Sequence, residues 1–161
     1  MSIRISHMHK IDRSASMNIQ DTSTQKLHEL LKTMSLDEYG AYITDHNLQN
    51  MPSISAYFER YILEHGLTKK ELVKNSFLDR TYGYQILSGL RKPSKDKILA
   101  LCLSARMSFE EIQRALEIAQ TGILYAKDPR DAAIILCIHN GMYNVNDINQ
   151  FLVQEGFAMI K

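Results

Sequence analysis

Residues 67–93 constrain the fold more than any other part of the chain, because they predict two short helices joined by a tight turn. The first helix is expected to begin at Thr68, since Thr68 and Glu71 have capping-box spacing and each side chain can bond the other's backbone amide. The second is expected to begin at the N-cap residue Asp79 and to end at Ser88-Gly89, where glycine can take a left-handed exit. These signals predict a helix-turn-helix.

Helical signals continue on both sides of this segment. Ser35 with Glu38 and Ser108 with Glu111 repeat the capping-box spacing, and Asp128-Pro129 places a proline directly after an N-cap residue. No segment alternates polar and apolar residues as a strand would. The sequence therefore predicts an all-α protein, a compact helical bundle containing the helix-turn-helix, with N- and C-terminal helical extensions.

Apolar residues at i, i+3, i+4 and i+7 mark the helix faces that are expected to be buried. Three such stripes are Leu27, Leu30, Leu31 and Met34; Ile98, Leu101, Cys102 and Ala105; and Ala132, Ile135, Leu136 and His139. The predicted organisation has four parts: a flexible tail (1–22), an N-terminal helical extension (23–52), the helix-turn-helix bundle (53–121) and a C-terminal helical extension (122–161). His7 and His9 lie in the tail, where two ligands on a mobile segment do not make a metal site.

Charge is distributed unevenly along the chain. Residues 54–107 contain ten Lys and Arg against five Asp and Glu, whereas residues 1–53 and 108–161 are slightly acidic. The surplus positive charge therefore surrounds the predicted helix-turn-helix, as a surface that faces phosphates requires. A run of charge is also the normal composition of a solvated face, so this signal needs the motif beside it.

Composition argues against several other classes of protein. The longest apolar run, residues 132–138, is too short to span a bilayer, and the N-terminus lacks the apolar core of a signal peptide, so we expect a cytoplasmic protein. Cys102 and Cys137 lie in apolar helical patterns and are expected to be buried, reduced thiols. There is no phosphate-binding glycine-rich loop, nucleophile elbow or zinc-binding His-Glu helix. We expect no enzyme activity, no cofactor and no metal.

The segment from Leu67 to Gly89, with the tail Arg91-Lys92-Pro93, resembles the Cro/repressor-type (XRE-like) helix-turn-helix DNA-binding family over about residues 54–107. The resemblance implies a five-helix bundle whose second and third helices contact DNA, and a role in transcriptional control, commonly as a dimer. Two positions depart from the family pattern. Phe77 occupies the turn position usually held by glycine, and Gly83 occupies a position usually held by a buried, branched apolar residue.

The resemblance also implies a set of DNA-contacting residues. Helix 79–88 would lie in the major groove of double-stranded DNA, with Arg80, Thr81, Tyr84 and Gln85 at the base edges; Tyr82 is expected to pack on neighbouring helices instead. Arginine can pair with guanine and glutamine with adenine. Phosphate contacts are expected from Lys69, Lys70, Ser88, Arg91, Lys92 and Lys95, which would fix the register without distinguishing sequences.

Two functions remain open at this point. The first is a sequence-specific DNA binder of the bacterial or phage regulator type. The alternative is a non-catalytic protein-interaction module, such as an antitoxin or adaptor, which keeps the bundle and binds a partner through the helices of 24–48 or 123–157. A homodimer through the C-terminal helices is a further possibility, because Ile123, Leu124 and Tyr125 and the 132–138 run supply apolar surface.

Overall fold

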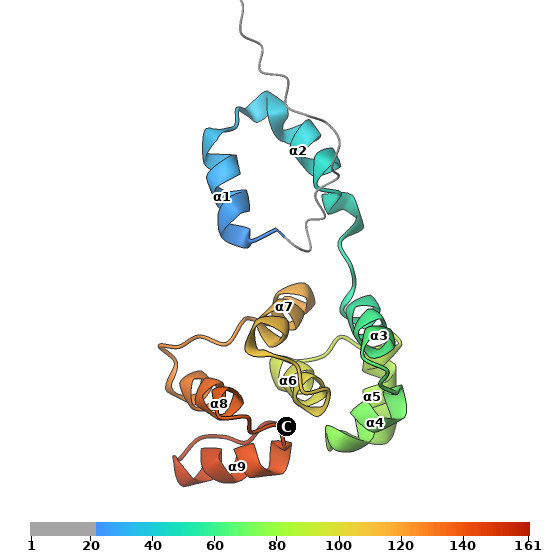
Figure 1. Cartoon of the computed structure of the whole chain (residues 1–161), viewed down its shortest axis with the longest axis vertical. Coiled ribbons are helices and arrows are strands. Elements are labelled where there is room, and N and C mark those ends of the chain that lie inside the picture. Colours follow the sequence, from blue (N-terminus) through green and yellow to red (C-terminus); the bar gives the residue numbers. More distant parts are fainter. Residues whose placement is uncertain (1–21) are drawn as a thin grey trace, which may run out of the picture. The chain divides into compact units, whose positions relative to one another are not determined.

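Helices make up the regular structure of residues 22–161, the part of the chain that the computed structural model describes. Nine α-helices and two short 3-10 helices follow one another in this range, with no strand among them (Figure 1). The predicted all-α class is confirmed. The chain divides into two units, Met1–Met51 and Pro52–Lys161, and each is described by itself.

The first unit contains α1 (Thr24–Thr33), a 3-10 helix (Leu36–Glu38), α2 (Tyr39–Asp45) and a second 3-10 helix (Leu48–Asn50). The predicted pairing of Ser35 with Glu38 is present, because the Glu38 carboxylate accepts hydrogen bonds from the Ser35 backbone N at 2.7 Å and from Ser35 Oγ at 2.8 Å. It opens a 3-10 turn that leads into α2. The tail predicted for residues 1–22, with His7 and His9, lies outside the described residues except for Thr22.

The apolar stripe of α1 is not buried, contrary to the prediction. Leu30 is 39% exposed, Leu31 is 44% exposed, and no residue of α1 is buried. Among the described residues of this unit, Tyr42 is the one buried apolar side chain. The prediction fails because a periodic stripe identifies the face of a helix that would gain from burial, but it does not supply a second surface to cover that face.

The second unit contains seven helices around one core. They are α3 (Ile54–Glu64), α4 (Lys69–Asn75), α5 (Arg80–Leu87), α6 (Lys95–Ser104), α7 (Phe109–Ala119), α8 (Pro129–His139) and α9 (Val145–Gln154). The core runs from Tyr57 in α3 to Ile160 near the C-terminus. Residues 122–161, expected as an extension, therefore share one core with α3 to α7.

Helix α6 is the centre of this unit. It contacts α4, α7 and α9, and α3 contacts α5 and α7 around it (Figure 1). The stretch Ile98–Leu103 is buried on every side, which goes beyond the single stripe predicted for this helix. A helix that is apolar all round requires neighbours on all faces. Helices α4, α7 and α9 thus depend on the same central element.

Two ion pairs join α6 to α8. Lys95 Nζ lies 2.6 Å from Asp131 Oδ2, and Arg130 Nη2 lies 3.0 Å from Asp96 Oδ2. Each helix supplies one basic and one acidic residue, and these are consecutive in the sequence: Lys95 and Asp96 in α6, and Arg130 and Asp131 in α8. Asp131 also accepts a bond from the Tyr125 backbone N at 3.0 Å, and its side chain is only 7% exposed. These contacts fix the loop before α8 as well as the helix itself.

The buried face of α8 differs from the predicted one. Residues Ala133, Ile134, Cys137 and Ile138 are buried, whereas Leu136, expected inside, is 54% exposed and His139 is also exposed. The run 132–138 is apolar throughout, so periodicity alone cannot choose its inner face. The ion pair of Asp131 with Lys95 makes that choice, because Asp131, Ile134 and Ile138 lie at i, i+3 and i+7 on one side of the helix.

Side-chain amides hold the two irregular segments near the C-terminus. Gln113 in α7 donates to the Leu124 carbonyl at 2.9 Å and accepts from the Leu124 backbone N at 2.8 Å. Asn149 in α9 makes the same pair of bonds to Ile160, at 3.1 and 2.7 Å. Each amide satisfies both backbone groups of one residue outside the helices. Leu124 and Ile160 are thereby held with their side chains buried in the core.

Candidate nucleic-acid interface

The start of each helix in the predicted motif is fixed by its capping residue. Thr68 Oγ1 accepts from the Glu71 backbone N at 3.2 Å, and the Glu71 carboxylate accepts from the Thr68 backbone N at 3.0 Å, so the predicted capping box of α4 is confirmed. Asp79 Oδ1 accepts from the Tyr82 backbone N at 2.9 Å, which confirms the predicted start of α5. The N-terminal turn of α5 is therefore ordered by its own sequence.

The turn between α4 and α5 passes through a left-handed residue, and that residue is Phe77. Its φ is +58°, a conformation that costs a residue with a Cβ roughly 1–2 kcal/mol. The Phe77 side chain is 56% exposed, so its burial offsets little of this conformational free energy. Ser76 stabilises the turn from inside, because its buried hydroxyl donates to the Val73 carbonyl at 2.8 Å. Phe77 thus holds a turn conformation that glycine would adopt without strain.

Gly83 lets α5 approach α4 closely. A Cβ built at this position would lie 2.8 Å from Val73 Cγ1 and 3.1 Å from Val73 Cγ2, shorter than normal carbon contacts. Val73 is β-branched and cannot move aside easily. The second departure from the family pattern therefore has a packing reason: the branched side chain that fills this space comes from α4 instead of α5.

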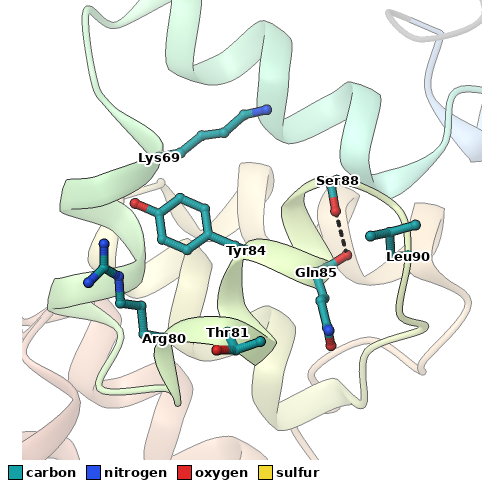
Figure 2. A pocket seen from close by; sticks show the side chains of 7 residues that line it. All are labelled: Lys69, Arg80, Thr81, Tyr84, Gln85, Ser88 and Leu90. Atoms are coloured by element: carbon teal, nitrogen blue, oxygen red, sulfur yellow. Dashed lines mark hydrogen bonds between the residues drawn. The ribbon is translucent and has the colours of Figure 1, made fainter.

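Polar residues of α5 lie on one face together with Lys69 of α4; Arg80 and Thr81 are exposed there, and Tyr84 and Gln85 are half-buried. They line a shallow groove of about 660 Å³ whose walls are Lys69, Arg80, Thr81, Tyr84, Gln85, Ser88 and Leu90. Figure 2 shows Lys69 reaching over the groove from α4, while Arg80, Thr81, Tyr84 and Gln85 project from α5. All four predicted base-contacting residues thus line one surface.

A second hollow of about 420 Å³ lies beside the first and shares Arg80 and Tyr84 with it. Lys70 and Lys74 stand at its edge, over an apolar floor of Val73 and Leu78. No acidic residue lines either hollow. Together the two hollows have four basic residues in their walls, Lys69, Lys70, Lys74 and Arg80, which come from α4 and α5.

The segment after α5 folds back onto it. The Gln85 backbone carbonyl accepts from the Leu90 N at 2.9 Å and from the Arg91 N at 3.2 Å, and the Arg91 side chain donates through Nε to Gln85 Oε1 at 3.2 Å. Lys92 is exposed beside this turn, and Pro93 is buried. Arg91 therefore contacts the α5 face and does not extend freely toward solvent.

The packing predicted for Tyr82 is confirmed, whereas Lys95 has a different partner from the one predicted. Tyr82, expected to pack laterally, is half-buried against the core. Lys95, expected to contact phosphate, instead binds Asp131 and donates to the Ile123 carbonyl at 2.9 Å. The sequence could not reveal this use of Lys95, because Asp131 follows 36 positions later.

Two residues that line this face, Lys74 and Leu90, are not among those predicted from the sequence. Lys74 lines the second hollow, and its signal is the i, i+4 spacing from Lys70 on the same helix. Leu90 lines the groove with 78% of its surface exposed. A large apolar side chain at a polar face has no local sequence signal, since it depends on how the chain turns back after α5.

Within the described residues there is no reactive thiol, no cluster of metal ligands and no membrane-spanning helix. Cys102 and Cys137 are free and buried, as predicted, and burial raises the pKa of both thiols, so neither is a ready thiolate. No group of three or more His, Cys, Asp or Glu residues within 22–161 is placed to hold a metal ion. None of the helices in the same range has the length and hydropathy needed to cross a membrane.

Comparisons of the chain with protein-family models, with curated proteins and with solved structures find no match.

Proposed function

We propose that this protein binds double-stranded DNA, with α5 in the major groove, and acts as a transcriptional regulator. The observation that carries the proposal is the groove whose walls hold Arg80, Thr81, Tyr84 and Gln85 together with Lys69 (Figure 2). Side chains of these types supply the hydrogen bonds and apolar contacts that distinguish base pairs in the major groove. Arg80 and Thr81 lie in the first turn of the capped helix α5, and Tyr84 and Gln85 lie one turn further along it, on the side that contacts bases in such a motif.

The charges around the groove support the same proposal. Within residues 22–161, Lys69, Lys70, Lys74, Arg80 and Lys92 form no ion pair with an acidic side chain. Basic groups with no acidic partner can neutralise phosphates and release bound counterions, which is the main source of affinity for DNA. Lys95 is left out of the proposed phosphate contacts because its charge is used inside the protein.

Selection of duplexes from fragmented genomic DNA tests this function. We expect an enriched motif, palindromic if the protein dimerises as paired half-sites require. Arg80→Ala should lower affinity for that motif by about 1–3 kcal/mol and relax the preference at one position. Lys92→Ala serves as the matched control, because loss of a phosphate contact should weaken all sequences alike and reduce the salt slope by about one. Absence of enrichment, with negligible binding to random DNA at low salt, would contradict the proposal.

A protein-interaction role is the second candidate, and the first unit favours it. Leu30, Leu31, Leu36 and Tyr39 are exposed there, in a unit with few buried residues of its own. Leu30 and Leu31 are adjacent in α1, and exposed apolar side chains that lie together mark surfaces that bind other proteins. This role can accompany DNA binding, and a variant of the chain with Leu30→Ser and Leu31→Ser should lose the partner while it keeps its affinity for short duplexes.

A further inference from the structure

The side-chain amide of Gln85 has a defined orientation. Arg91 Nε donates to Gln85 Oε1 at 3.2 Å. A guanidinium has only hydrogen-bond donors, so the atom of Gln85 that faces it must be the oxygen. The amide nitrogen Nε2, with two donors, is the free end of the side chain. This assignment follows from the chemistry of the partner and does not depend on telling nitrogen from oxygen by shape.

Arg91 is itself held in place by several contacts. The Gln85 backbone carbonyl accepts from the backbone N of Leu90 and of Arg91. Ser88 Oγ donates to the same oxygen at 3.2 Å (Figure 2). The guanidinium carbon of Arg91 lies 5.7 Å from the centroid of the half-buried Tyr82 ring. Backbone bonds and a cation–π contact thus fix both ends of Arg91, which an arginine kept only for a phosphate would not need.

We infer, on the basis of the proposed DNA binding, that Gln85 and Arg91 act together as one set of donors and that they select guanine over adenine. A glutamine alone favours adenine, because its oxygen accepts from N6 while its nitrogen donates to N7. Here that oxygen already accepts from Arg91. The N6 amino group of an adenine would have to approach the same oxygen beside a positively charged group made of donors, which is unfavourable.

Guanine has the complementary edge. Its O6 and N7 are both acceptors in the major groove, and they can accept from Gln85 Nε2 and from the remaining N–H groups of Arg91. Arg91 then determines specificity in two ways: it orients the Gln85 amide, and it adds positive charge where guanine concentrates its acceptors. A phosphate contact by Arg91 would have neither effect, so the two roles for this residue lead to different measurements.

Selection from a pool of random duplexes, followed by sequencing of the bound fraction, distinguishes these roles. The purified full chain is compared with Gln85→Ala, Arg91→Lys and Lys92→Ala. Gln85→Ala identifies the position that Gln85 contacts, because preference should be lost there and kept elsewhere. At that position the unsubstituted protein should favour guanine over adenine by about tenfold, the usual effect of one good base contact.

Arg91→Lys is the decisive variant. Lysine keeps the positive charge that attracts phosphates but lacks the planar group that binds the Gln85 oxygen. We expect the guanine preference at the Gln85 position to shift to adenine, with little loss of total affinity. Lys92→Ala should lower affinity for all sequences and leave every base preference unchanged. Thermal unfolding of each variant checks that the exposed substitutions leave the fold intact.

Each outcome has one meaning. A guanine preference that moves with Arg91→Lys supports the inference. An adenine preference in the unsubstituted protein, or a guanine preference that Arg91→Lys leaves unchanged, overturns it while DNA binding stands. If the unsubstituted protein enriches no sequence at all and does not bind random DNA at low salt, the proposed function itself fails.

Discussion

The two sides of helix α6 use charged residues in opposite ways. On the side of α8 and α9, Lys95 and Arg130 bind Asp131 and Asp96, and the side chains of all four are at most 25% exposed. On the side of α4 and α5, Lys70, Lys74 and Arg80 are exposed around two hollows with no acidic residue in their walls. The charged residues on the side of α8 and α9 stabilise the fold, whereas those on the side of α4 and α5 remain available to bind a ligand.

The two sides also differ in what holds them together. Helices α4 and α5 meet through the close approach of Gly83 and Val73 and are defined by their capping residues. Helix α8 is held by ion pairs whose partners are far apart in sequence. A basic residue near α4 and α5 is therefore not by itself evidence for a free positive charge. Lys95 lies near these helices in sequence, yet Asp131 is its ion-pair partner in the fold.

Asp131→Ala is expected to give the largest effect on this comparison. It leaves the three-quarters buried Lys95 without its acidic partner and removes the acceptor for the Tyr125 backbone N, so the free energy of unfolding should fall by about 3 kcal/mol. Urea unfolding measures this. Arg80→Ala, on the other side of α6, is the control and should change stability by less than about 0.5 kcal/mol. Similar losses for the two variants would remove the contrast between the sides.

Gly83→Ala tests the packing of α4 against α5. The new Cβ would overlap Val73, which should cost about 1–2 kcal/mol after the gain in helix propensity is subtracted. Combined with Val73→Ala, which removes the obstructing methyl groups, the same substitution should become stabilising. A double variant less stable than Val73→Ala alone would show that Gly83 is needed for another reason. Chemical unfolding of the three variants completes this cycle.

Phe77→Gly is expected to stabilise the protein, by about 1 kcal/mol, because glycine takes the left-handed conformation of the turn without strain. Phe77→Ala is the matched control, since it removes the same exposed ring but keeps a Cβ. Only the glycine variant should raise the midpoint of thermal unfolding. If both variants lower it equally, the Phe77 side chain contributes more to the turn than its exposure indicates.

Local signals in the sequence were sufficient for the helices. The capping residues Thr68, Asp79 and Ser108 predict helix starts that the structure has within one residue, because each cap depends on atoms two or three positions away. The four predicted base-contacting residues line one groove for a similar reason, since residues one turn apart on a capped helix share a face.

Features that depend on distant partners were not predictable in this way. The predicted inner face of α8 is wrong because Asp131 pairs with Lys95 across 36 positions, and the same pairing gives Lys95 a partner inside the protein. The stripe of α1 was expected inside because periodicity does not say whether a covering surface exists. The bond between Arg91 and Gln85 is not predictable from the sequence either, because it requires the chain to turn back after α5.

The amides of Gln113 and Asn149 make the C-terminal half sensitive to the exchange of a single atom. Each donates through nitrogen and accepts through oxygen, to the backbone of Leu124 or Ile160. If the nitrogen were replaced by oxygen, as in Gln113→Glu or Asn149→Asp, the side chain would keep its size and shape. It would then set a carboxylate oxygen against a carbonyl oxygen, so that attraction becomes repulsion. Two segments without secondary structure thus owe their place in an all-helical protein to the difference between an amide and an acid.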